Sequence, residues 1–161
     1  MATTSPAPEE TKEMNVINMN CKTSRGLTLL EILIALFVLS VGLLGLAGLQ
    51  MTGLKNNHSA QMRTEATIQA NNILERMRVN RAVALAGGYD IALSATPPGG
   101  SNLVQTDLNQ WLTALANNLP AGDGSIQTDL GTGVTVITIQ WNDSKGTGGS
   151  STQTFTLGSK I

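Results

Sequence analysis

The chain has 161 residues, of which 41% are hydrophobic and 13% are charged, and this suits one small domain together with an apolar segment. A formal net charge of −1 argues against a nucleic-acid binder that acts through its overall charge. The single cysteine, Cys21, excludes a disulfide framework and a metal site built from several cysteines within these residues.

Residues 1–26 form a polar segment that carries both charge signs and lacks a periodic apolar pattern. This composition predicts a cytoplasmic leader without regular structure. Met14 and Met19 are alternative start sites to Met1 within it. Lys22 and Arg25 precede the next segment and favour an orientation in which the amino end stays in the cytoplasm.

Residues 27–49 form an apolar run whose only polar side chains are those of Thr28, Glu31 and Ser40. As a helix this run would be about 34 Å long, which is enough to cross a bilayer. A cleaved secretory signal is the alternative, but the apolar core of such signals spans only about 7–15 residues. The run here is longer and contains an acid, so it predicts a membrane-spanning helix with the remaining protein outside the cytoplasm.

Glu31 is the one acid in the apolar run. A charged side chain at the bilayer centre costs about 2.5–3.5 kcal/mol on insertion scales, and the cost is smaller near the interface, where Glu31 lies. One interpretation is an acid that reaches the lipid headgroups. The other is functional, because cleavage between Gly26 and Leu27 would create an α-amino group about one helical turn away. The amine of a second copy could then pair with this carboxylate.

Residues 26–31, GLTLLE, followed by ILIALFVLSVGLLGLAGLQ, resemble the processing motif of type IV pilins and type II secretion pseudopilins. The resemblance implies that prepilin peptidase cuts after Gly26 and N-methylates Leu27, and that Glu31 aligns the subunit during assembly. Leu27 stands where phenylalanine is usual, and both side chains are apolar. Other minor pilins, the major pilin and the pilus assembly platform are the implied partners, first in the inner membrane and then in a cell-surface pilus.

The end of this run, SVGLLGLAGLQ, and two further stretches, NNLPAGDGSI and VTVITIQWND, are similar to the minor pilins of type IV pili. A minor pseudopilin of type II secretion, a tip adhesin or DNA-uptake subunit, and a plain membrane anchor stay open as alternatives. Nucleic-acid binding through ERMRVNR is the less favoured interpretation, because such a charged face is more often solvated or turned toward another subunit.

Beyond the span, apolar and small residues recur every three or four positions, which is typical of one helical face. They are Met51, Leu54, His58, Met62, Ala66, Ala70, Ile73 and Met77. We therefore predict that the helix continues as an amphipathic outer half, residues 51–86, and stops before Gly87 and Gly88. His58 lacks ligand-type neighbours and is interpreted as a partly packed polar residue, not as a metal ligand.

Glycines interrupt the membrane half and the start of the outer half, and each lowers helix propensity by about 1 kcal/mol relative to alanine. They are Gly42, Gly45, Gly48 and Gly53. Close packing against neighbouring helices in the membrane is one explanation. The family resemblance suggests another, in which this stretch loosens when the subunit enters a filament.

Charge is distributed unevenly beyond the membrane run. The outer helix up to Arg81 carries a net charge of +3, and the residues from Ala82 onward carry −3. We expect these opposite charges to help register one subunit against the next.

Residues 87–161 are predicted to form the head, which opens with a loop containing Pro97 and Pro98. A short helix then runs from a cap at Thr106 to about Asn118. GVTVITIQW alternates with β-branched residues and predicts a strand, with TQTFTL as its partner and residues 125–130 as a third. The predicted fold class is α+β and type IV pilin-like: a leader (1–26), a membrane half (27–50) and an outer half (51–86) of one long helix, and a small antiparallel sheet with one extra helix (87–161).

No pattern in the sequence supports catalysis. The acids do not form an acid–base pair in one pocket, His58 has no nucleophile partner, and no phosphate-binding glycine motif is present. We expect a structural protein without enzyme activity, a cofactor or a metal.

Overall fold

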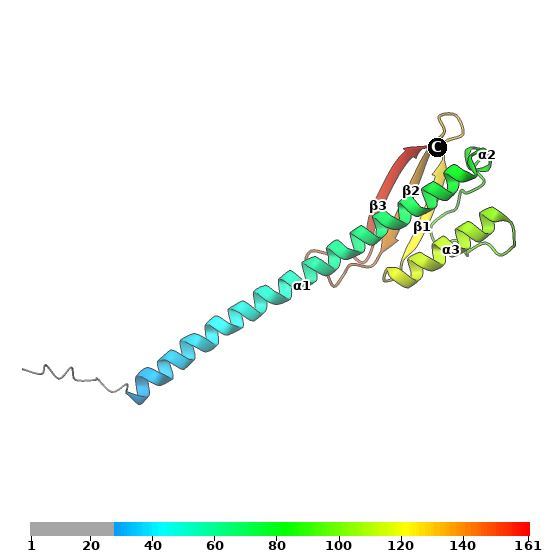
Figure 1. Ribbon diagram of the computed structural model, residues 1–161. Coiled ribbons are helices and arrows are strands. Elements are labelled where there is room, and N and C mark those ends of the chain that lie inside the picture. Colours follow the sequence, from blue (N-terminus) through cyan, green and yellow to red (C-terminus); the bar gives the residue numbers. More distant parts are fainter. Residues whose placement is uncertain (1–27) are drawn as a thin grey trace, which may run out of the picture. The chain divides into compact units, whose positions relative to one another are not determined.

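The structure, a computed structural model, describes residues 28–161, so the predictions for the leader, Gly26 and Leu27 lie outside it (Figure 1). Two units are distinguished along the chain, with the boundary between Ser40 and Val41. The elements are α1 (Leu29–Val79), α2 (Arg81–Leu85), α3 (Leu103–Asn118), β1 (Asp123–Thr128), β2 (Val134–Trp141) and β3 (Gln153–Lys160). A long N-terminal helix, a three-stranded antiparallel sheet and a short extra helix confirm the predicted α+β pilin-like fold.

In the first unit, the described residues are the start of α1 and the residue before it. Every residue from Thr28 to Ser40 is exposed, including Leu29 and Phe37 with exposed fractions of 88% and 67%. An apolar surface of this kind is unfavourable in water and favourable in lipid. By length and composition, α1 can cross a membrane.

In the second unit, the outer part of α1 forms one side of the head's core. Met62, Ala66, Ala70, Ile73 and Met77, all in the predicted stripe, are buried. The first three members of that stripe, Met51, Leu54 and His58, are exposed. The prediction that His58 is partly packed is therefore wrong, because the first residue of this stripe that the head buries is Met62.

The long helix ends earlier than the sequence predicted. α1 stops at Val79, Asn80 takes a non-helical conformation (φ −106°, ψ 45°), and the separate helix α2 follows. The Asn80 carbonyl oxygen accepts hydrogen bonds from the N–H groups of Val83 and Ala84, both at 3.1 Å. The turn redirects the chain so that Ala84 is fully buried, whereas Val79 stays 86% exposed. Core packing, rather than a local breaker residue, sets this boundary.

α3 begins three residues before the predicted cap at Thr106. Asn102 is its N-cap, and its side-chain oxygen accepts a hydrogen bond from the N–H of Gln105 at 2.8 Å. The cap prediction at Thr106 is wrong, although both residue types suit the role. The helix buries four large apolar side chains, namely Leu108, Trp111, Leu112 and Leu115.

The sheet has the order β1-β2-β3 with antiparallel pairing throughout. Ile126, Ile137 and Leu157 lie opposite one another across the three strands, on the face that packs against the helices. Gly124 on the same face allows a close approach to α3, because a Cβ there would collide with the ring of Trp111. Figure 1 shows the outer part of α1 crossing this face, with α3 beside it.

Candidate processing and assembly site

Thr28 caps the start of α1. Its side-chain oxygen accepts a hydrogen bond from the N–H of Glu31 at 3.2 Å, and its carbonyl oxygen accepts one from the N–H of Ile32 at 3.2 Å. Both bonds satisfy N–H groups that otherwise lack partners at a helix amino end. The helix therefore begins at a defined residue, directly after the predicted cleavage position between Gly26 and Leu27.

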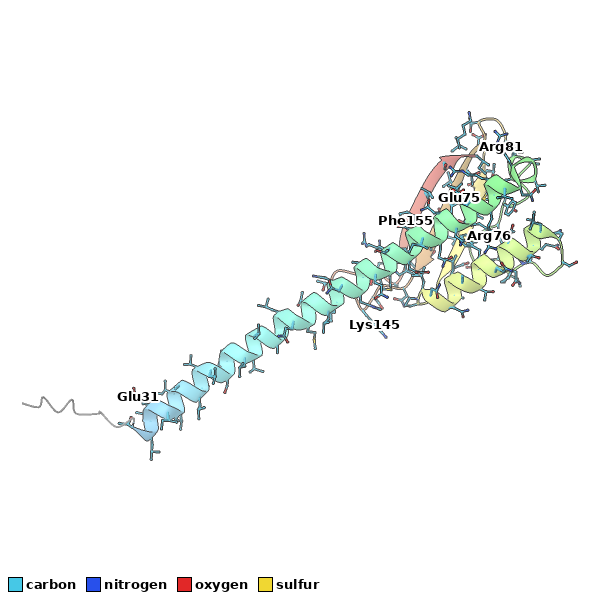
Figure 2. All side chains as sticks on the ribbon, in the orientation of Figure 1. Glu31, Glu75, Arg76, Arg81, Lys145 and Phe155 are labelled. Atoms are coloured by element: carbon cyan, nitrogen blue, oxygen red, sulfur yellow. The ribbon has the colours of Figure 1, made fainter. Side chains whose placement is uncertain are left out.

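Glu31 lies in the first turn of α1, three residues after this cap (Figure 2). The positive end of the helix dipole favours a carboxylate at this position. Glu31 is exposed, and no cation pairs with it anywhere in residues 28–161. The carboxylate predicted to align subunits is thus accessible to a charged group from another chain.

The contribution of Thr28 was not predicted from the sequence. The signal that identifies it is Thr-Leu-Leu-Glu immediately before an apolar run, which has the form of a capping box. In that motif the acid at the third helical position and the capping hydroxyl act together at the helix start. The same Glu31 that interrupts the apolar run is therefore also part of the signal that starts the helix.

We predict that Thr28→Ala increases hydrogen exchange at the amides of Glu31 and Ile32 by about fivefold, because an N-cap is worth about 1 kcal/mol. The measurement is amide exchange on the full chain in detergent micelles. Thr28→Ser retains the hydroxyl and should exchange like the unmodified chain. Equal exchange in the alanine and serine variants would contradict the capping role.

The glycines of the membrane half and of the start of the outer half have no packing role within a single subunit. For Gly42, Gly45, Gly48 and Gly53, an added Cβ would meet nothing within 4 Å among the atoms of the described chain. Their small size is therefore available for contacts with other helices or for local loosening of α1, the two explanations considered above.

Charged residues of the head and outer helix are largely bound within the chain, and this changes the prediction that they register neighbouring subunits. Every acid after Ala82 accepts a hydrogen bond from its own chain: Asp90, Asp107, Asp123, Asp129 and Asp143. Backbone N–H groups of Gly131 and Thr132, for example, lower the pKa of Asp129. Some of these acids hold turns and loops, whereas Asp107 and Asp143 bind residues of α1.

The arginines of ERMRVNR are engaged in the same way. Arg76 forms a 3.1 Å ion pair with Asp107 of α3, and Arg78 forms a 2.6 Å ion pair with Glu75. Arg81 donates to the carbonyl oxygen of Ile161 at 3.2 Å. Figure 2 shows Glu75, Arg76 and Arg81 on the part of α1 and α2 that lies over the head.

Tyr89 extends the Arg76–Asp107 pair into a buried network. Its hydroxyl donates to the second carboxylate oxygen of Asp107 at 2.8 Å and accepts from Asn80 at 3.4 Å. Burial raises the pKa of Tyr89 above its usual value, so the hydroxyl stays protonated and continues to donate at neutral pH. The network joins α1, the turn at Asn80 and α3, and its role is structural.

Within the described part of the chain, no three His, Cys, Asp or Glu side chains gather in a way that could hold a metal ion. His58 lies exposed beside a hollow of about 390 Å³ that Glu65 and Asn118 also line. One oxygen of Glu65 accepts hydrogen bonds from Gln69 and Asn118 at 2.8 and 2.9 Å.

A family model described as the prokaryotic N-terminal methylation motif matches residues 21–47. These residues include Gly26, Leu27 and Glu31, together with the Thr28 cap. No curated protein and no solved structure matches the chain significantly. The motif implies processing by prepilin peptidase and assembly with other pilins, and the apolar α1 fits membrane anchoring.

Proposed function

Because the methylation motif indicates a type IV pilin-like protein, either a pilin or a pseudopilin, we propose that this chain is a minor pilin. It is a structural subunit without catalytic activity, which is cleaved after Gly26, N-methylated at Leu27 and incorporated at low abundance to prime or modify a type IV pilus. The observation that carries the proposal is the start of α1, where Thr28 caps an exposed apolar helix and Glu31 is unpaired within residues 28–161.

The charge chemistry of assembly follows from this helix start. Cleavage would leave the α-amine of Leu27 directly before the Thr28 cap and about one helical turn from Glu31. In lipid, a carboxylate and an amine from adjacent subunits gain more from pairing than they would in water, because little solvent competes with the ion pair. The pair forms only when neighbouring helices are in the correct axial register, so it can align an incoming subunit.

The membrane stage requires a defined orientation. Lys22 and Arg25 keep the leader in the cytoplasm, where the cleavage site is then adjacent to the membrane surface. The head lies on the periplasmic side of the inner membrane until the subunit enters the pilus. This order of events supplies the new amine at the depth of Glu31.

The specific type that we propose is PilV, also called the type IV pilus modification protein. The supporting similarity covers the apolar ending SVGLLGLAGLQ and two stretches of the head. NNLPAGDGSI runs from the end of α3 into β1, and VTVITIQWND forms β2 and the two residues after it. The similar stretches thus belong to the exposed apolar part of α1 and to the head.

A DNA-uptake role receives less support, because Arg76 and Arg78 form ion pairs within the subunit. Arg81 donates a hydrogen bond to the backbone carbonyl oxygen of Ile161. Phosphate binding would have to break these contacts. A minor pseudopilin of type II secretion shares the whole processing scheme with a minor pilin. Neighbouring pilus genes or secretion genes would distinguish the two.

The proposal is tested by amino-terminal sequencing and mass spectrometry of the chain from cells with and without prepilin peptidase. We expect an N-methylated Leu27 amino terminus only in cells that have the peptidase. Recovery of the intact leader as the sole species in peptidase-positive cells would overturn the proposal. Deletion of the gene should then reduce or alter surface pili, whereas an unchanged pilus with lost secretion would identify a pseudopilin.

A further inference from the structure

The two edges of the sheet differ in their backbone hydrogen bonding. On β1, the outward N–H groups belong to Gly124, Ile126 and Thr128. Asp123 accepts from Gly124 at 2.7 Å, the carbonyl oxygen of Ile91 accepts from Ile126 at 2.9 Å, and Asp90 accepts from Thr128 at 2.9 Å. This edge is closed to any further strand.

β3 forms the other edge, and its outward N–H groups can be identified from the register. Ile126 bonds outward to Ile91, so its partner Ile137 on β2 must bond toward β3, where it pairs with Leu157. The outward positions on β3 therefore alternate with Leu157, and they are Thr154, Thr156, Gly158 and Lys160. Within residues 28–161, none of these four N–H groups has a hydrogen-bond acceptor.

The open edge is long and lacks the usual protection of an exposed strand. β3 has eight residues in an uninterrupted register with β2, contains no proline, and carries only one charge, Lys160 at its end. Phe155 and Leu157 on the inner face are only half-buried, so apolar surface extends to the edge.

Gly158 gives an independent indication that another backbone approaches. Glycine weakens a strand, and it commonly marks a bulge or the close approach of a second chain. Here no bulge is present, and an added Cβ would meet nothing within 4 Å. The missing side chain leaves its cross-strand neighbour Val136 39% exposed, beside a hollow of about 450 Å³ that Val134 also lines.

A second copy of this chain does not suit antiparallel pairing at this edge. Ser59 on α1 donates to Asp143, whose N–H bonds to Ser150 just before β3, and Arg78 donates to Ser159 near the end of β3. β3 and α1 therefore run in the same direction (Figure 1). Antiparallel pairing of two β3 edges about a two-fold axis would place the two α1 helices in opposite directions. Subunits anchored in one membrane by the same end of α1 cannot adopt that arrangement.

We propose that the β3 edge binds an extended segment of a different protein, which adds a fourth strand to the sheet. The segment has apolar side chains beside Phe155 and Leu157 and an aromatic or large aliphatic side chain opposite Gly158, where it covers Val136. This inference rests on the proposed function only in assuming that the chain is a membrane-anchored subunit that acts in an assembly.

The test places a photo-cross-linking amino acid at Thr154 of the full chain, in cells that also express a second, differently tagged copy. The same cross-linker at Gln127, which is exposed on the closed β1 edge, is the positional control. We expect an adduct from Thr154 with a protein other than this chain. Mass spectrometry should map the adduct to a proline-free segment of the stated pattern.

Substitutions on β3 test whether the adduct arises from an added strand. Thr156→Pro removes one outward N–H and should lower the adduct yield by about tenfold, whereas Thr156→Val retains the N–H and should stay within about twofold. Gly158→Val fills the position opposite the bound side chain and should also lower the yield. This variant covers the case in which the proline variant fails to fold, because nothing in the subunit obstructs its side chain.

Absence of an adduct, an adduct only with the tagged second copy, or yields unaffected by both Thr156→Pro and Gly158→Val would overturn the added strand. Leader cleavage and incorporation of the unmodified chain are measured in the same cells. A cleaved and incorporated chain without the adduct would contradict this inference alone, whereas an uncleaved chain would contradict the proposed function.

Discussion

Replacement of Glu31 by alanine is expected to leave leader cleavage largely intact and to prevent incorporation into pili. The carboxylate is exposed in the first turn of α1, and no cation within residues 28–161 neutralises it. Alanine removes the group that would pair with the amine of a neighbouring subunit in lipid, while the cleavage position after Gly26 keeps its sequence. The readout is the amount of processed chain in membranes and in sheared pili.

Glu75→Ala is the matched control, because Glu75 is an acid on the same helix with a 65% exposed side chain and only a surface ion pair to Arg78. We expect this variant to be processed and incorporated normally. If Glu31→Ala were as abundant in sheared pili as the unmodified chain, Glu31 would have no role in alignment.

Ile73→Ala is expected to lower the free energy of unfolding of the head by about 2–5 kcal/mol, which is typical for truncation of a buried aliphatic side chain. Ile73 lies on the outer part of α1 and is fully buried in the core shared with α3 and the sheet. Small domains have only about 5–15 kcal/mol of stability in total, so this loss would be large. Denaturant unfolding of the full chain in detergent, followed by tryptophan fluorescence, measures the effect at Trp111 and Trp141.

Ile68→Ala makes the same chemical change five residues earlier on α1, at a side chain that is 54% exposed. We expect this control to change the free energy of unfolding by no more than about 0.5 kcal/mol. If Ile73→Ala lowered the free energy of unfolding as little as Ile68→Ala does, the head would fold without α1 as part of its core.

Much of the fold was predictable because its signals are local. The apolar run of α1, the alternating residues of β2 and the leucine spacing of α3 each reflect the period of one element. Glu31 was singled out as a candidate alignment residue because an acid in an apolar run is costly. Thr28 could have been predicted by the same local reasoning, since the capping box lies within four consecutive residues.

Other features depend on which segments meet, and the sequence does not contain them in a local form. The stripe from Met51 to Met77 has one period throughout, yet only the part from Met62 onward is buried, because that is where the head covers α1. The break at Asn80 follows from the packing of Ala84 rather than from a breaker residue. The start of α3 likewise lies at Asn102 and not at Thr106, because the Asn102 side chain accepts the hydrogen bond from the N–H of Gln105.

The sequence by itself determined the apolar run of α1, the N-terminal methylation motif and the kinds of elements in the head, because each depends on residues that are close together in the chain. Only the tertiary structure decided that Arg76 would pair with Asp107, 31 residues away, and that β1 would be closed at its edge while β3 stayed open. Hydrogen bonds and ion pairs require partners at about 3 Å, and folding alone brings distant residues to that distance.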